Sequence, residues 1–160
     1  MIFSVQFKKS ARIVCGTLFF LYLFYLAYVL FLSPSFGRTL GVPREYNLSP
    51  FKTISNYIIY RSYVNPKTLI INIIGNIVAF MPMGFFVPIL FRNKRTFLKV
   101  IIFSALVSLV VELLQYKLVV GSFDIDDIIL NTVGGAIGYI IFNLTYKIYG
   151  FLRQLKKGKT

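Results

Sequence analysis

Four long apolar blocks limit what this 160-residue chain can fold into. They run over residues 11–32, 68–91, 97–120 and 126–146. Each block is long enough for a transmembrane helix, which needs about 20 apolar residues to cross a bilayer. Hydrophobic residues make up 57% of the chain and its mean hydropathy is +0.73, more apolar than an ordinary soluble domain. The sequence therefore predicts an all-α integral membrane bundle of four transmembrane helices.

The four blocks leave room for one domain, which we place at residues 11–150. Residues 1–10 precede it, and residues 151–160 form a basic tail. Lys8, Lys9 and Arg12 stand before the first block, as basic residues do in a signal peptide. The block is longer than the apolar region of a signal peptide, and no good Ala-x-Ala site follows it. We interpret it as a retained span.

The distribution of Lys and Arg predicts the orientation of the bundle. Of the 18 basic residues, 12 lie in the N-terminal segment, the loop between spans two and three, and the C-terminal tail. The other 6 lie in the long loop at residues 33–67 and at Lys117. By the positive-inside rule both termini are cytoplasmic and the long loop is outside. The net charge of +13 thus reflects topology and attraction to anionic headgroups, and no nucleic-acid partner is expected.

The chain lacks the residues of several common catalytic schemes. It contains no histidine, and Cys15 is its single cysteine. Ser-His-Asp and Cys-His nucleophiles, histidine-ligated metals and disulfides are therefore excluded. If the protein catalyses a reaction, its catalytic groups must be carboxylates, of which its side chains provide five.

The outer loop contains signals for helical structure. Ser49 followed by Pro50 has the form of an N-cap with proline at the first helical position, and Ile54 and Ile58 follow at helical spacing. We expect a short interfacial helix here, with nearby tyrosines at headgroup level. Asn65–Pro66 repeats the capping pattern and predicts the start of the second span.

Polar residues inside the spans recur at helical spacing, so each set shares one face of its helix. They are Asn72 and Asn76 in the second span, Glu112 and Gln115 in the third, and Asp124, Asp127 and Asn131 at the start of the fourth. At a rise of about 1.5 Å per residue, Asn76, Glu112 and Asn131 would each lie roughly 12 Å below the outer boundary. Three helices would thus bring polar groups to one level, which predicts an outward-facing polar pocket.

Among the polar residues inside the spans, Glu112 is the strongest indication of a functional site. Ionisable side chains inside a membrane are costly and usually mark a functional site. No Lys or Arg lies near Glu112 in its own helix. Its carboxyl group would therefore be protonated, or would share a proton or cation with neighbouring groups.

Structural explanations stay open for the other polar residues. Asp124 can serve as the N-cap of the fourth span, with Asp126 and Asp127 in its first turn, where the helix dipole favours negative charge. The amide side chains can link helices through hydrogen bonds. Gly134 and Gly138 are spaced for close helix packing.

Four short segments together carry a family resemblance. They are YNLSPF at 46–51, NIVAFMPMG at 76–84, SLVVELLQ at 108–115 and DIDDIILNTVGG at 124–135. In this order they resemble the VanZ-like family of small bacterial membrane proteins, over about residues 46–145. The family pattern falls on Asn47, Pro50, Asn76, Pro82, Gly84, Glu112, Gln115, Asp124, Asp127, Asn131 and Gly134.

The chain departs from the family pattern at one place. Many relatives have an arginine just before the acidic motif, where this chain has Gly121, Ser122 and Phe123. If that arginine pairs with an aspartate in relatives, Lys117 or a loop arginine would have to replace it here.

The resemblance implies antibiotic resistance at the cell surface, with reduced susceptibility to glycopeptides that carry an acyl chain, such as teicoplanin. It also implies a multi-pass protein of the bacterial cytoplasmic membrane. Our leading hypothesis is a non-catalytic membrane protein without a cofactor. Its polar pocket would engage a membrane lipid, a lipid-linked cell-wall precursor or the acylated glycopeptide. The ligand-binding candidates are Asn47, Asn72, Asn76, Glu112, Gln115, Asp124, Asp127 and Asn131.

Two alternatives remain open from the residues. The first is a metal-dependent enzyme acting on a lipid-linked phosphate, in which Glu112, Asp124 and Asp127 would be catalytic and would hold a divalent cation. The second is a lipid or proton transporter with Glu112 as a relay, which would need a homo-oligomer because four spans are few for a monomeric transporter.

Overall fold

The computed structural model describes residues 9–34, 45–91 and 95–157, and it confirms the four-helix membrane bundle. Its long helices are α1 (Lys9–Phe31), a composite helix over Pro66–Leu90, α5 (Phe97–Leu118) and α6 (Ile125–Lys157). Each is long and apolar enough to cross a bilayer. The expected span limits agree with these helices to within about two residues, except at the end of α6.

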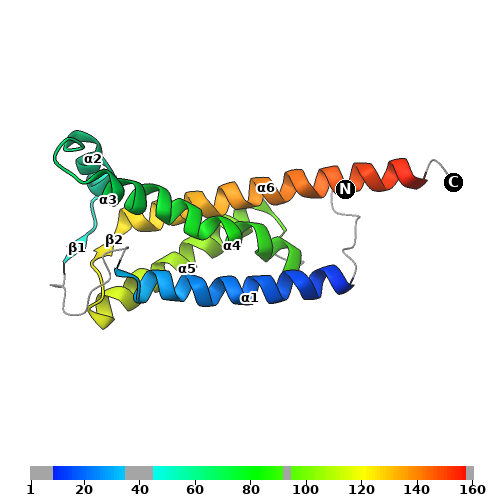
Figure 1. Cartoon of the computed structure of the whole chain (residues 1–160), viewed down its shortest axis with the longest axis horizontal. Helices are drawn as coiled ribbons and strands as arrows, with labels where there is room; N and C mark the ends of the chain where they lie inside the picture. Colours follow the sequence, from blue (N-terminus) through cyan, green and yellow to red (C-terminus); the bar gives the residue numbers. More distant parts are fainter. Residues whose placement is uncertain (1–8, 35–44, 92–94, 158–160) are drawn as a thin grey trace.

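The four long helices run side by side, with the short elements gathered at one end (Figure 1). These are β1 (Tyr46–Asn47), α2 (Lys52–Ile59) and β2 (Phe123–Asp124). We call this the loop end. The start of α1 and the end of α6 lie at the opposite end, as an even number of spans requires. That the loop end faces outside stays a prediction from the charges.

The second span is made of three helical pieces. They are α3 (Pro66–Ile70), the π-helical turn η2 (Ile71–Gly75) and α4 (Asn76–Leu90). The predicted cap is confirmed, because the Asn65 side chain accepts a hydrogen bond from the Lys67 amide and Pro66 follows it. Single π turns inside α-helices are rare and are frequently found at functional sites. This one lies directly before Asn76.

Glycines let α4 and α6 pack with their backbones in contact, which confirms the close-packing interpretation of Gly134 and Gly138. A Cβ atom added to Gly134 would overlap the carbonyl group of Ile77, and one added to Gly138 would overlap that of Met81. Gly84 of α4 faces the backbone of Gly135 in the same way. Small residues commonly allow such approach between membrane helices.

The short helix α2 differs from its expected start. It begins at Lys52, and its N-cap residue is Phe51 in the left-handed conformation with φ 62°, rather than Ser49. The Ser49 amide instead donates to the side chain of Asn47, which forms a turn before the helix. No side chain from the loop itself caps α2, so its first amides need partners from elsewhere.

Helix α6 continues well past the expected end of the fourth span at residue 146. It runs to Lys157, so most of the predicted basic tail is helical. Residues 147–157 contain no proline, and leucine, lysine and arginine favour helices. The N-terminal residues 1–8, the loop arginines 38 and 44, and residues 158–160 lie outside the described ranges.

Candidate functional site

Asp124 joins the two strands of the loop end to the start of α6. It caps α6 as one interpretation predicted, since its Oδ1 accepts the Asp126 amide at 2.9 Å. The same oxygen accepts from Asn47 Nδ2 at 3.0 Å, and Oδ2 accepts from Thr53 Oγ1 at 2.6 Å. Strands β1 and β2 pair in parallel and place Asn47 opposite Asp124. One carboxylate thus ties together three segments that are distant in sequence.

Asp126 provides the missing cap of α2. Its carboxylate accepts hydrogen bonds from the backbone amides of Phe51, Thr53 and Ile54, at 2.8 Å for Thr53 and 3.1 Å for Ile54. The side chain is fully buried at 0% exposure. Because Asp126 also lies in the first turn of α6, its negative charge faces the positive ends of two helices. The sequence predicted a role for Asp126 only in its own helix, and this contact with α2 was not expected.

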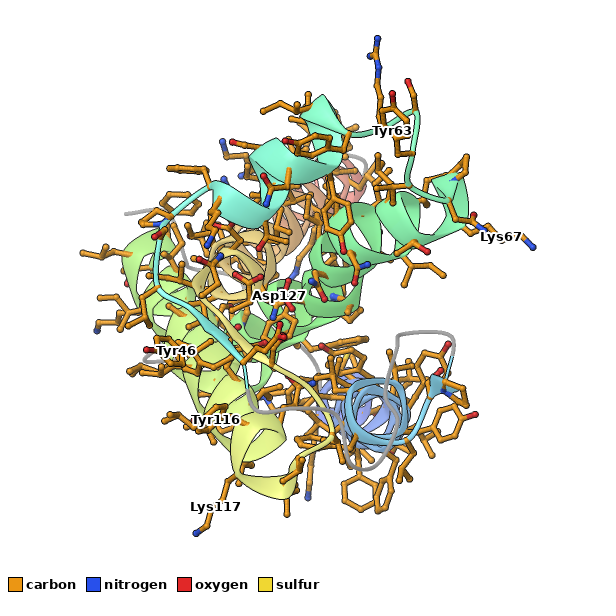
Figure 2. The ribbon with its side chains drawn as sticks, turned by 90° about the vertical axis from the view of Figure 1, so that its left-hand side faces the viewer. Tyr46, Tyr63, Lys67, Tyr116, Lys117 and Asp127 are labelled. Carbon is orange, nitrogen blue, oxygen red and sulfur yellow. The ribbon has the colours of Figure 1, made fainter. Side chains whose placement is uncertain are left out.

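Asp127 points in a different direction, toward the second span. Its Oδ1 accepts from Asn76 Nδ2 at 2.7 Å. Asn76 also donates to the Asn72 carbonyl, and Asn72 Nδ2 donates to the Tyr57 hydroxyl at 2.9 Å. Viewed from the loop end, Asp127 lies near the middle of the molecule, among α4, α5 and α6 (Figure 2). The chain of contacts therefore runs from α6 through the π-helical turn to α2.

Tyr57 is a member of this chain that the sequence did not single out as a site residue. Burial raises the pKa of its hydroxyl, and the negative charges of Asp127 and Asp124 raise that pKa further. The hydroxyl therefore stays neutral at physiological pH. It accepts from Asn72 and can also donate a hydrogen bond.

Glu112 lies beneath β2 and is 1% exposed. Its Oε2 accepts the Asp124 amide at 3.0 Å, so it meets the acidic motif through the backbone. Glu112 and Asp124 are thus neighbours, but they do not form a metal site with Asp127. Within residues 9–34, 45–91 and 95–157, no group of three His, Cys, Asp or Glu side chains is placed to hold a metal ion.

Asn131 and Gln115 form separate contacts deeper in the bundle. Asn131 Nδ2 donates to Ser108 Oγ at 2.8 Å, and Gln115 Nε2 donates to the Leu30 carbonyl at 2.7 Å. The carbonyl oxygens of both side chains are buried without a partner among the described residues. Asn76, Glu112 and Asn131, expected at one level, thus make three separate contacts: Asn76 and Asn131 with other helices, and Glu112 with strand β2.

The serines of α5 allow a test of these buried contacts. Ser104 Oγ is buried without a hydrogen-bond partner among the described residues, whereas Ser108 Oγ receives the Asn131 amide. We expect Ser104→Ala to leave the free energy of unfolding unchanged or higher, and Ser108→Ala to lower it by about 1 kcal/mol. Thermal unfolding of both variants in one detergent checks this, and equal midpoints would contradict it.

The loop-end polar cluster is the set of residues in two adjoining groups of contacts, one around Asp124 and Asp126 and one from Asp127 to Tyr57. Its members are Asn47, Thr53, Tyr57, Asn72, Asn76, Glu112, Asp124, Asp126 and Asp127. Six of them were candidates from the sequence, and Thr53, Tyr57 and Asp126 were not. Lys117 is exposed and points away from Asp127 in Figure 2, so it does not replace the arginine of relatives.

The fold and the cluster define a class: a small multi-pass membrane protein with a buried acidic cluster at one end of its bundle. A family model described as VanZ/LLP1 matches residues 19–146. The chain therefore belongs to the VanZ/LLP1 family.

A curated relative agrees with this assignment. Protein VanZ of Enterococcus faecium is 31% identical over 104 residues, which cover 65% of this chain and 56% of the relative. The chain thus matches little more than half the length of that protein. No solved structure matches.

Proposed function

We propose that this protein lowers the susceptibility of a bacterium to teicoplanin, a glycopeptide that carries an acyl chain. It would do so from the cytoplasmic membrane, with its loop end facing outward. Membership of the VanZ/LLP1 family and the similarity to Protein VanZ support this proposal. The observation that carries it is the loop-end polar cluster, in which the half-buried carboxylates of Asp124 and Asp127 lie at the end of the bundle that the charges predict to face outward.

The chemistry of the cluster indicates what kind of group it engages. It presents carboxylate and amide oxygens, together with the amide of Asn47 and the hydroxyl of Tyr57. Such a surface suits a ligand rich in hydrogen-bond donors, such as sugar hydroxyls, peptide amides or an ammonium group. Negative charge disfavours a bare phosphate. A lipid-linked cell-wall precursor and an acylated glycopeptide both carry sugars and peptide amides.

Binding without catalysis accounts for the contacts with the fewest assumptions. Each carboxylate of the acidic motif accepts hydrogen bonds from neighbouring segments, as groups that shape a binding site do. The metal-dependent alternative would need Glu112, Asp124 and Asp127 to converge on one cation, which their contacts in the described structure do not show. We therefore propose a ligand-binding membrane protein.

Substituting Glu112 tests the proposal directly. We expect Glu112→Gln to remove protection against teicoplanin, because it replaces the buried, ionisable carboxyl group by a neutral amide without a large change in volume. The measurement is the minimum inhibitory concentration of teicoplanin and of vancomycin in a susceptible Gram-positive host, with membrane levels of the protein matched.

The chain offers a matched control for this experiment. Glu45→Gln makes the same chemical change at an exposed residue of the same loop end, and it should keep wild-type protection. Full protection by the Glu112→Gln protein, or none by the wild type, would count against the proposed function.

A further inference from the structure

An apolar groove lies between α1 and the second span, with a volume of about 250 Å³. Its lining includes Tyr22, Tyr25 and Val29 of α1, and Gly75, Val78 and Pro82 of the second span. Val78 and Tyr25 are exposed on the surface of the bundle, so the groove opens toward the surrounding lipid. The groove is distinct from the loop-end polar cluster.

One of the two tyrosine hydroxyls of the groove lining is already engaged. The Tyr22 hydroxyl donates to the Ala79 carbonyl at 2.7 Å, which fixes α1 against α4. The remaining lining is almost entirely apolar. Water would gain few hydrogen bonds there, since a stable water site needs two to four polar partners.

The groove is too confined for another transmembrane helix. A helix with its side chains has a diameter of about 10–12 Å, and tight helix pairs in membranes approach through small residues. The small residues of this face, Gly75 and Ala79, line the groove beside α1, and its volume of about 250 Å³ is far smaller than a helix. A narrower occupant, with the width of a single hydrocarbon chain, matches the remaining space.

The π-helical turn connects this groove to the loop-end polar cluster. Asn72 of the turn and Asn76 directly after it bond Tyr57 and Asp127, whereas Gly75 of the turn lines the groove. A polar surface and an apolar surface therefore adjoin on the same few residues. This arrangement fits an amphiphile, whose polar part and hydrocarbon part are joined.

We propose that the groove binds one hydrocarbon chain of the amphiphile that the loop-end polar cluster engages. The inference rests on the proposed function and names the chemical class of its ligand: a membrane amphiphile held by both its polar group and its chain. The hydrocarbon chain would make dispersion contacts with the groove lining, and the adjoining polar cluster would favour an amphiphile whose polar group it binds.

Photolabelling tests the groove independently of resistance. The full-length protein is placed in phosphatidylglycerol nanodiscs that contain a trace of phosphatidylglycerol with a diazirine on one acyl chain. After illumination, mass spectrometry maps the labelled residues. We expect Tyr22, Tyr25 and Val78 to be labelled several-fold more strongly than equally exposed residues elsewhere on the bundle. Labelling that follows exposure alone would overturn the inference.

Two valines provide a matched pair of variants for the same experiment. Val78 lines the groove and Val110 of α5 does not, yet both are 54% exposed. Val78→Phe should fill the groove and reduce labelling of Tyr22 and Tyr25 to the level set by exposure, while Val110→Phe should leave it unchanged. Equal labelling in the two variants would overturn the proposed chain site.

The resistance assay separates the two proposals. If the Glu112→Gln protein protects normally but groove labelling is focused and sensitive to Val78→Phe, the proposed function fails and the chain site stands. If Glu112→Gln abolishes protection while labelling follows exposure, the chain site fails and the proposed function stands.

Discussion

Replacing Asp126 by asparagine should release the first turn of α2 from the bundle. The carboxylate accepts three backbone amides of that turn, and α2 has no cap from its own loop. Asparagine has one acceptor oxygen and no charge, so buried amides would lose their partners. We expect the free energy of unfolding to fall by about 2–4 kcal/mol, given roughly 1–3 kcal/mol for each unsatisfied buried group.

Hydrogen exchange measures the release of α2 as a loss of amide protection at individual residues. In the Asp126→Asn protein, amide protection should fall at residues 51–54, which form the start of α2. Asp127→Asn is the matched control, because it makes the same change one residue away, at a side chain that bonds Asn76 of α4. If the two variants exchange alike at residues 51–54, Asp126 does not hold α2.

Adding one methyl group at Gly84 should destabilise the whole bundle. A Cβ atom there would overlap the backbone of Gly135, and a backbone carbonyl cannot rotate away as a flexible side chain can. Helices α4 and α6 would have to separate along their contact. We expect Gly84→Ala to lower the free energy of unfolding by about 3 kcal/mol, the upper range for overpacking a tight interface.

Gly16 of α1 is the matched control for this substitution. A Cβ atom at Gly16 would meet the Leu90 side chain at 3.8 Å, which is an ordinary contact. Gly16→Ala should therefore leave the thermal midpoint in detergent unchanged or raise it, because alanine favours helix over glycine by about 1 kcal/mol. Equal midpoints for Gly84→Ala and Gly16→Ala would show that close packing of α4 and α6 is not required.

Local sequence signals were sufficient for the spans and for some helix starts. The bilayer demands about 20 apolar residues per helix, so the blocks were visible without tertiary information. Asn65 and Asp124 cap the helices that directly follow them, and such contacts depend only on neighbours in the chain. The end of α6 could not be predicted from hydropathy, which marks where a membrane span ends, whereas a helix can continue beyond it.

The site was only partly predictable. Helical spacing correctly grouped Asn72 with Asn76, and the family pattern added Asn47, which bonds Asp124. The prediction missed Thr53 and Tyr57 because their partners lie in other segments. The role of Asp126 was hidden because Ser49–Pro50 has the form of a cap for α2, whereas in the structure the N-cap residue is Phe51, whose side chain makes no capping hydrogen bond.

The sequence alone determined the class of this protein, its four spans and the helix faces that carry polar groups, because each depends on hydropathy and on spacing within one helix. Only the tertiary structure decided which polar groups meet. Asp126 and Asp127 are adjacent in the chain, yet one holds α2 and the other binds α4. Neighbouring side chains on a helix point about 100° apart, so their partners follow from how the helices pack around them.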